Sequence, residues 1–540
     1  MIEKSWSPSV LARGRARLLP SRSPFGKSGS AGASPSLKCV CAVLLTCSWG
    51  LSLTSRGGDQ PQWGERFSRN MVSAEKNLPD SFDPATGKNI AWVANLGSQS
   101  YATPIIAGGK VLIGTNNDRP RDPKQQGDRA VLMCLDQADG HLVWQLVVPK
   151  LEDDPYLDWP KAGFASAPTV EGDRVYTLTN RGEVVCLDLN GMANGNDGPF
   201  IDEGRHMTPR GEPLMTPGPT DADIIWICDL KKEAGIHTHD QVHGSILIDG
   251  DLLYVNSCNG VDNTHRVIRC PDAPSLVVLD KRTGRLVARD NERIGPDIFH
   301  CQWSSPSLGT VNGKKLIFFG GDNGVCYAFD ALGSVPPADQ VADLHRVWRF
   351  DCDPTAPKQD VHKYVGNRKE SPSVIFGMPV FQNGRIYLTC GGDLWWGKRK
   401  GWLKCIDATK TGDITQSGEL WSYPMPRETC STPAVYNGMV FAADCGGTLH
   451  CVDAETGKPL WTYKCDGACW GSPMVADGKV YIGTRAGEFD VLAASREKRV
   501  ISSFQVNEPI SATATVANGT LYVATMNHLY AVRKGPNAAQ

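Results

Sequence analysis

The sequence predicts an all-β protein: an eight-bladed β-propeller of four-stranded antiparallel blades, with its ring closed by the N-terminal strand. Two observations predict this fold. A unit of about 40 residues, the length of one propeller blade, recurs near the C-terminus and opens at Pro433, Pro473 and Ala514. The last unit stops at Val532 without its final strand, and a matching strand occurs around Trp92.

Eight such units follow one another, and the earlier ones are longer because they carry insertions. The small or proline residues that open them are Pro104, Pro168, Ser245, Pro306, Pro379, Pro433, Pro473 and Ala514. In each unit a first apolar strand leads to a turn, often an Asn-Gly or Asp-Gly pair, which predicts a tight hairpin. A second and third strand and a short fourth strand follow, so one unit accounts for one blade.

Tryptophan closes most of these units. The fourth strands contain Trp144, Trp226, Trp348, Trp421 and Trp461. A large aromatic residue at a fixed repeat position suits packing between neighbouring blades. Because the eighth unit lacks this strand, we expect the segment TGKNIAWVANL around Trp92 to complete it, which would remove the free edges of the ring.

The ending DAETGKPLW at Asp453 resembles the pyrroloquinoline quinone (PQQ) repeat of quinoprotein alcohol dehydrogenases and of the propeller lipoprotein in the outer-membrane barrel assembly machinery. The resemblance covers the chain from Trp92 to Arg533. The stretches NRGEVVCLDLNGMANGNDGPFIDEG and SCNGVDNTH are most similar to secreted PQQ-like propellers of planctomycete-type bacteria. This resemblance implies the fold but no single function, since one propeller architecture hosts many activities.

Composition indicates one folded domain with no nucleic-acid partner. The net charge is −2 and the chain has no basic run, so nothing favours binding to a polyanion. A closed propeller can hold a chain of this length in one domain, and we expect a monomer. The expected divisions are a basic leader with a signal peptide at 1–56, a linker at 57–85, the propeller at 86–533 and a tail at 534–540.

Residues 1–56 predict export. Basic residues up to Lys38 precede an apolar stretch from Cys39 to Leu53, which is the pattern of a signal peptide and too short for a membrane span. We therefore expect a periplasmic or extracellular protein with no transmembrane span in the mature chain. A lipid anchor on Cys47 is the alternative, and it would make the protein membrane-associated.

The 18 cysteines do not all point to a disulfide framework. Four of them occupy one repeat position, two residues before the Asp that ends the third strand: Cys134, Cys186, Cys405 and Cys451. Other units hold Val or Ala there, so the position predicts a small buried slot. Local bridges between Cys258 and Cys270, or between Cys465 and Cys469, stay open as alternatives.

Quinoprotein chemistry is the enzymatic alternative that the resemblance raises. Those enzymes clamp PQQ with a disulfide between adjacent cysteines, beside a Ca²⁺ ion and a catalytic aspartate. This sequence contains no Cys-Cys pair, and no residue can be assigned as catalytic. The motifs of serine hydrolases, P-loop proteins and HExxH metalloproteases are also absent from it.

Residues just before each inner strand should surround the mouth of the central channel, where propellers bind ligands. The candidates there are Tyr101, His239, Asp240, His243, His300, Trp303, Arg427, Glu428 and Trp470. Aromatic walls with a few polar groups suit a planar or glycan-like ligand. The alternative is that these rings simply pack together or are hydrated.

Two segments carry metal-binding residue types. HTHDQVH places His237, His239 and His243 within seven residues, and His300 of the next unit could approach them as a ligand for Zn²⁺ or Cu²⁺. A Gly-rich insertion supplies oxygen ligands of the kind that Ca²⁺ prefers: Asp188, Asn190, Asn194, Asn196, Asp197 and Asp202. Ordinary turns and loops are the alternative roles for these residues.

These observations favour an exported binding or scaffold protein whose partner is a protein, a glycan or a small molecule. The site is expected at the channel mouth or on a rim decorated by the long insertions of units two to five. Trp395 and Trp396 of one insertion would form an exposed patch with nearby basic residues or a cover over the blade. A PQQ-dependent oxidoreductase and an outer-membrane assembly factor are the alternatives, with Ca²⁺ and PQQ as the candidate cofactors.

Overall fold

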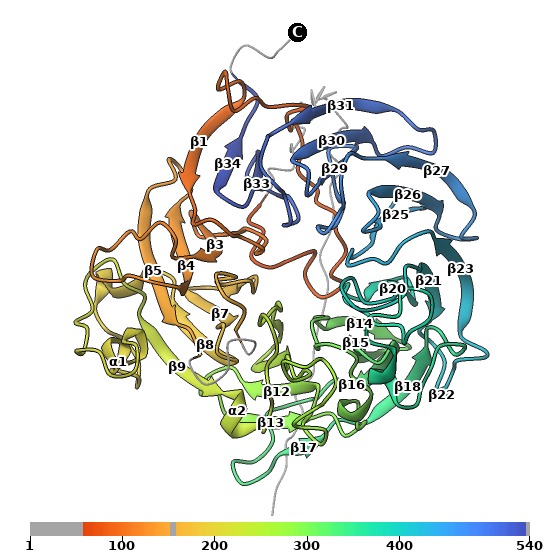
Figure 1. Ribbon diagram of the computed structural model, residues 1–540, viewed down its shortest axis with the longest axis horizontal. Helices are drawn as coiled ribbons and strands as arrows, with labels where there is room; N and C mark the ends of the chain where they lie inside the picture. Colours follow the sequence, from red (N-terminus) through yellow and green to blue (C-terminus); the bar gives the residue numbers. More distant parts are fainter. Residues whose placement is uncertain (1–57, 152–157, 536–540) are drawn as a thin grey trace, which may run out of the picture. The chain divides into compact units, whose positions relative to one another are not determined.

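Eight sheets arranged around a common centre make up the part of the chain that the computed structural model describes, residues 58–151 and 158–535 (Figure 1). Every sheet is antiparallel through its first four strands. The predicted all-β, eight-bladed propeller is therefore confirmed. The predicted leader and signal peptide at 1–56 lie outside the described residues.

The first four blades follow one another in chain order. Blade 1 contains β2 (Ile105–Ala107), β3 (Lys110–Asn116), β4 (Arg129–Asp136) and β5 (Leu142–Pro149). Blade 2 contains β6 (Thr169–Glu171), β7 (Arg174–Leu178), β8 (Glu183–Asp188) and β9 (Ile224–Asp229). Blade 3 contains β10 (Leu247–Asp249), β11 (Leu252–Asn256), β12 (Leu276–Asp280), β13 (Leu286–Arg289) and the short parallel strand β17 (Ala342–Asp343). Blade 4 contains β14 (Ser307–Val311), β15 (Lys314–Gly320), β16 (Val325–Asp330), β18 (Arg346–Asp351) and the short parallel strand β22 (Gly412–Asp413).

The other four blades complete the ring. Blade 5 contains β19 (Val380–Gln382), β20 (Arg385–Gly391), β21 (Gly401–Asp407) and β23 (Glu419–Met425). Blade 6 contains β24 (Ala434–Tyr436), β25 (Met439–Ala443), β26 (Thr448–Asp453) and β27 (Pro459–Lys464). Blade 7 contains β28 (Met474–Ala476), β29 (Lys479–Gly483), β30 (Glu488–Ala493) and β31 (Val500–Gln505). Blade 8 contains β32 (Thr515–Ala517), β33 (Thr520–Ala524), β34 (His528–Val532) and β1 (Ile90–Asn95).

Helices are short and lie in the insertions. They are α1 (Glu203–Met207), α2 (Leu230–Glu233) and the 3₁₀ turns η1 (Gly191–Asn194), η2 (Gly295–Asp297) and η3 (Val361–Tyr364). None of the helices in the described residues is long and apolar enough to cross a membrane.

The N-terminal strand closes the ring. Strand β1 pairs antiparallel with β34, and Trp92 lies opposite Ala531. This confirms the predicted completion of the last blade. Because this pairing joins the two ends of the propeller, blade 8 has the same four strands as the others and exposes no unpaired β34 edge.

The repeated tryptophan explains the small buried slot. Cys134, Cys186, Cys405 and Cys451 are all buried, and each lies directly opposite the tryptophan of its own blade. In blade 7 the same pair is Val491 and Ser502. The core-slot prediction is confirmed, since all four cysteines are buried and form no disulfide.

Each of these tryptophans also joins two blades. Trp421 of blade 5 donates its indole N–H to the carbonyl of Ala454 in blade 6, at 3.0 Å. Its ring lies against Gly457, where an added Cβ would come within 2.6 Å of the indole. Gly457 also has a φ of +67°, so the Thr-Gly turn of the repeat needs glycine for both conformation and close approach.

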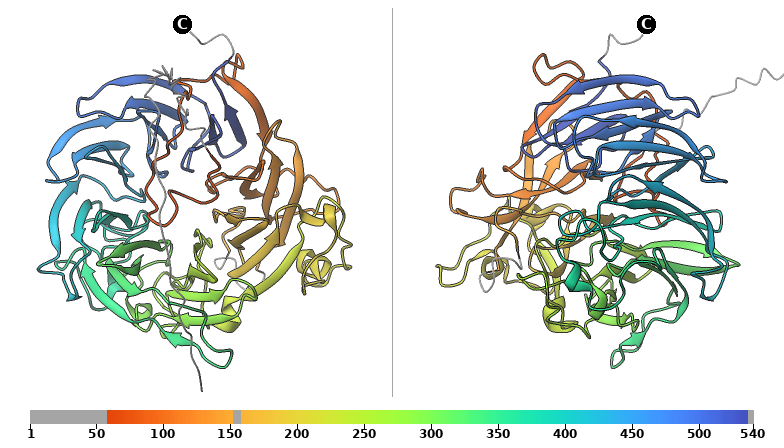
Figure 2. Two further views of the ribbon diagram at one scale, coloured as in Figure 1. Left: turned by 180° about the vertical axis from the view of Figure 1, so that it is seen from behind. Right: turned by 45° about the vertical axis from the view of Figure 1, so that its right-hand side comes forward.

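A segment before the propeller, residues 58–82, which we call the strap, runs along the inner ends of the blades. It accepts backbone hydrogen bonds from Ile106, Val170, Leu308, Phe381 and Val475. Its side chains bind blades 3, 6 and 8 at Ser245, Val435 and Asn518. The strap therefore contacts all eight blades, and it is seen crossing the middle of the ring in Figure 1 and Figure 2.

Arg69 anchors the strap. Its guanidinium is fully buried and donates to the carbonyl oxygens of Pro306, Trp63 and Ser245 and to the Ser245 hydroxyl. Burial lowers the pKa of Arg69 to about 9, so the side chain stays charged at neutral pH. One side chain thus ties the strap to two blades.

Candidate functional site

A cavity of about 670 Å³ lies where the eight blades converge. Each blade contributes residues from the segment that leads into its innermost strand. Five of the nine residues expected at the channel mouth line it: Tyr101, Asp240, His243, Trp303 and Trp470. Its volume is that of a site for a small organic molecule.

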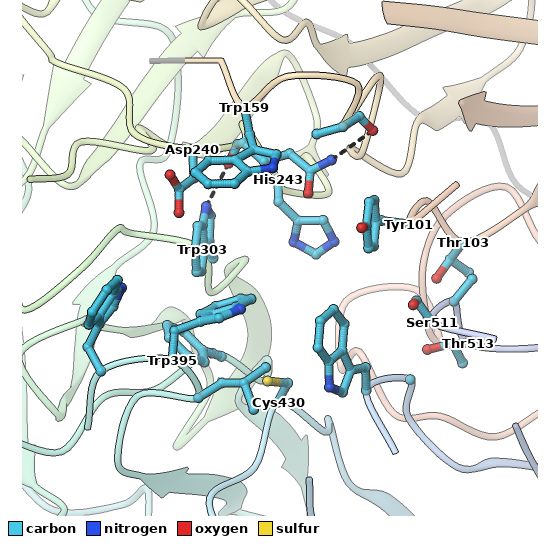
Figure 3. Close-up of a pocket in the computed structure, with 18 of the residues that line it drawn as sticks. Tyr101, Thr103, Trp159, Asp240, His243, Trp303, Trp395, Cys430, Ser511 and Thr513 are labelled. Atoms are coloured by element: carbon cyan, nitrogen blue, oxygen red, sulfur yellow. Dashed lines mark hydrogen bonds between the residues drawn. The ribbon is translucent and has the colours of Figure 1, made fainter. Parts of the chain in front are cut away.

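Aromatic rings form the walls of the cavity (Figure 3). The ring centroids of Trp303 and Trp395 are 5.7 Å apart, and those of Trp395 and Trp470 are 5.8 Å apart. Tyr101 stacks on Trp470 with centroids 6.4 Å apart. Trp395 keeps 45% of its surface exposed, so part of its indole is accessible to a ligand.

Trp395 and Trp396 are therefore part of the cavity wall. They come from the β20–β21 insertion of blade 5, which the sequence suggested as a patch or a cover. Lys398 of that insertion does not extend the wall, because it is buried and donates to Asp353 Oδ2 at 2.5 Å. The insertion thus brings two indoles to the centre of the ring and fixes its basic end elsewhere.

Polar groups are spread between the rings. Hydroxyl and amide side chains in the lining are Thr103, Gln241, Asn263, Thr264, Ser511 and Thr513. Burial lowers the pKa of His243 to about 4, so this imidazole is neutral at neutral pH. The described lining residues include the acid Asp240 but no lysine or arginine.

The other four predicted residues lie outside the lining. Arg427 and Glu428 pair with each other, Nη2 to Oε1 at 2.7 Å, and Glu428 is buried. His239 and His300 are buried next to Asp240 and His265. The potential ligand atoms of these last four residues all lie within 4.8 Å of one another.

We call His239, Asp240, His265 and His300 the His–Asp cluster. Its environment shifts the pKa values of its members. Burial lowers the pKa of His239 to about 3. Burial alone would also lower that of His300, but the flanking carboxylates of Asp393 and Asp240 outweigh it and raise the pKa to about 10. His265 was not among the sequence candidates, although it ends the quoted stretch SCNGVDNTH. His237 and His243 do not belong to the cluster.

The second metal candidate, in the β8–β9 insertion, is only partly assembled. Of its six predicted residues, Asp188 and Asp197 come together, and Asp223, which the sequence did not suggest, joins them. Asp202 is not part of that group. Of the asparagines, Asn194 contacts Asp197 Oδ2 at 3.4 Å, whereas Asn196 donates to Glu203 at 3.0 Å. Burial and the neighbouring carboxylates raise the pKa of Asp223 to about 6.

Comparison with known proteins identifies the family. The sequence matches the family model described as outer membrane protein assembly factor BamB over residues 69–196, 128–347 and 399–533. The chain belongs to this PQQ-like β-propeller family. Among solved structures, this PQQ-like propeller is similar to the quinohemoprotein alcohol dehydrogenase ADHIIG of Pseudomonas putida HK5, with a TM-score of 0.52 and 12% identity over 89% of this chain and 81% of that one.

Curated relatives of this PQQ-like propeller are similar over short segments. One is the dehydrogenase subunit of alcohol dehydrogenase (quinone) from Gluconobacter oxydans, 29% identical over 177 residues, which is 28% of this chain. Another is 1-butanol dehydrogenase (cytochrome c) from Thauera butanivorans, 27% identical over 180 residues, which is 30% of this chain. The chain spans 19% and 21% of the lengths of these two relatives.

Proposed function

We propose that this PQQ-like propeller is an exported binding protein that holds a small uncharged sugar in its central cavity. The observation that carries the proposal is the combination of indole walls with neutral hydroxyl and amide groups. The C–H face of a pyranose stacks on an indole, and its hydroxyls bond to Ser, Thr, Asn and Gln side chains. The wall combines segments that lead into the inner strands with Trp395 and Trp396 of the β20–β21 insertion.

A quinoprotein oxidoreductase is the alternative that the relatives suggest, and the cavity does not fit its cofactor. PQQ is a tricarboxylate, so its site must supply cations or many donors. The described lining residues supply no lysine or arginine and add the carboxylate of Asp240. Arg485 lies over Trp470 at 4.5 Å and donates to Ser511 Oγ, so its guanidinium is already engaged by two wall residues. The other alternative, a role in outer-membrane assembly, is supported only by the match to the BamB family model.

The test is calorimetric titration with neutral trisaccharides (maltotriose, cellotriose, xylotriose and mannotriose) and, separately, with PQQ. We expect saturable binding of at least one trisaccharide near one equivalent and quenching of indole fluorescence. Trp303→Ala, Trp395→Ala and Trp470→Ala should each weaken that binding by about 10- to 30-fold, because aromatic anchors dominate such sites. Trp421→Phe, which changes an indole between blades, is the control and should leave affinity unchanged. Saturable PQQ binding without sugar binding would contradict the proposal and restore the oxidoreductase alternative.

We also propose that Ca²⁺ binds in the β8–β9 insertion at Asp188, Asp197 and Asp223. Asp223 is fully buried, and its Oδ1 has no hydrogen-bond donor among the described residues. A cation would relieve the repulsion between these carboxylates. Adding 1–10 mM Ca²⁺ to chelator-treated protein should raise the melting temperature by about 2–5 °C, and Asp223→Asn should remove the response. An equal response in Asp223→Asn would refute this assignment.

Export stays a proposal, and so does the subgroup of secreted planctomycete-type propellers that the sequence suggested. The support for export is the basic and apolar pattern of residues 1–56, which is typical of a signal peptide. Amino-terminal sequencing of the protein recovered from cell fractions should give a mature chain that begins between Gly50 and Asp59. Recovery of full-length protein in the cytoplasmic fraction would contradict export.

A further inference from the structure

The His–Asp cluster has the dimensions of a metal site. Nε2 of His239 lies 3.0 Å from Nε2 of His265 and 3.2 Å from Asp240 Oδ1. Nε2 of His300 lies 3.1 Å from Asp240 Oδ2. In a tetrahedral zinc site with bonds of 2.0–2.1 Å, neighbouring ligand atoms are about 3.3 Å apart. The two contacts of His239 are therefore already close to edges of such a tetrahedron, and His300 approaches the same carboxylate at its other oxygen.

The cluster also has the electronic arrangement of a metal site. Two imidazole nitrogens that face each other at 3.0 Å need a shared proton or a cation between them. Asp240 Oδ1 is buried and accepts no hydrogen bond from the described residues. A carboxylate oxygen without a hydrogen-bond donor, Asp240 Oδ1, thus lies beside the two facing nitrogens of His239 and His265.

Partners outside the cluster orient His300. Its Nδ1 is 2.8 Å from Asp393 Oδ2, and the other oxygen of Asp393 accepts backbone N–H groups of Trp395 and Trp396 at 2.8 and 2.6 Å. This leaves Nε2 of His300 directed at Asp240. A carboxylate behind a histidine is the usual support of a metal-binding imidazole, since it fixes the tautomer and raises basicity.

The backbone holds the cluster in unusual conformations. Asp240 and His265 have φ angles of +55° and +57°, which non-glycine residues adopt rarely and at a cost. Gly260 packs between the segments of His239 and His300, where a Cβ would lie 2.8 Å from His239 Cβ. Three loops from separate parts of the chain are therefore brought into close contact at this point.

We propose that His239, Asp240, His265 and His300 bind one divalent first-row transition-metal ion, with Zn²⁺ as the ion to test. Imidazole nitrogens and a carboxylate oxygen suit such ions, and no thiol is included. Asp240 and His265 also line the central cavity. The ion would therefore lie at the cavity wall, where a molecule bound in the cavity can reach it. The proposal stands whether or not the cavity binds a sugar.

The test uses the mature protein after treatment with a chelator. It carries His141→Asn, so that the separate group of Asp136, Asp139 and His141 does not compete for the metal ion. Titration with Zn²⁺ should show one tight site, and Co²⁺ should give the visible absorption of a four-coordinate ion. Asp240→Asn and His265→Asn should each lower Zn²⁺ affinity by about 100-fold. Asn tolerates a positive φ, so these variants keep the loop conformation. Asp393→Asn, which acts through His300, should lower affinity by about 10- to 100-fold.

His243→Asn is the matched control, because this half-buried histidine lies three residues from Asp240 and lines the same cavity. It should bind Zn²⁺ within about twofold of the parent protein. The proposal is overturned if the parent binds neither Zn²⁺ nor Co²⁺ at 1 mM, or if Asp240→Asn and His265→Asn bind as tightly as the parent. It is also overturned if His243→Asn loses affinity to the same extent. Thermal melts of each variant confirm that the comparison is made on folded protein.

Discussion

Arg69→Ala is expected to lower the free energy of unfolding by about 3–5 kcal/mol. The substitution removes four hydrogen bonds from a buried guanidinium and leaves the carbonyls of Pro306, Trp63 and Ser245 without donors. Arg69→Lys should recover little of this loss, because an ammonium cannot reproduce the fork of planar donors. Urea unfolding followed by circular dichroism measures the effect.

Arg66→Ala provides the comparison within the strap. Arg66 is exposed and pairs with Glu171 at 3.5 Å, and exposed pairs contribute about 0–1 kcal/mol. If the two alanine variants were equally stable, the strap would not be an integral part of the folded propeller. A change in the denaturant slope of Arg69→Ala alone would indicate that the strap detaches before the blades unfold.

Trp144→Ala should destabilise the protein by a similar amount, about 3–5 kcal/mol. Trp144 is fully buried and its indole donates to the carbonyl of Leu189 at 2.8 Å, so alanine leaves both a cavity and an unpaired acceptor between blades 1 and 2. Thermal unfolding by calorimetry measures the loss. Trp144→Phe keeps most of the ring volume and should cost only about 1–3 kcal/mol. A loss as large for phenylalanine as for alanine would show that the hydrogen bond, not the packing, joins the blades.

The fold could be predicted because its information is repeated. The units share a turn and most share a tryptophan at the same position, so a strand that is misassigned in one unit is corrected by comparison with the others. The small buried position at Cys134 or Cys451 follows from the same repetition, because it always lies two residues before the Asp that ends the third strand. The cavity position was predictable for a related reason: a propeller brings equivalent inner residues, such as Tyr101 and Trp470, to one place.

What escaped prediction lies in segments that occur only once. The strap binds mainly through backbone groups and Arg69, and neither leaves a periodic pattern in the sequence. His265 and Asp393 belong to insertions of different lengths, so no repeat register places them beside His300. Asp223 comes directly before an ordinary strand, β9, and only the fold reveals that Asp188 and Asp197 lie next to it.

The contacts of the strap have a consequence for biogenesis. Its residues are made before any blade, yet the Glu75 carboxylate reaches its partner only when Asn518 has been synthesised, and β1 must likewise wait for β34. A nascent chain therefore carries β1 and the Glu75 carboxylate without these partners until nearly all of its length has emerged. Such long sequence separations slow folding, so the native state should be reached only after synthesis ends. Truncation within the last blade would leave β1 and the Glu75 end of the strap without these partners, and therefore exposed to aggregation and proteolysis.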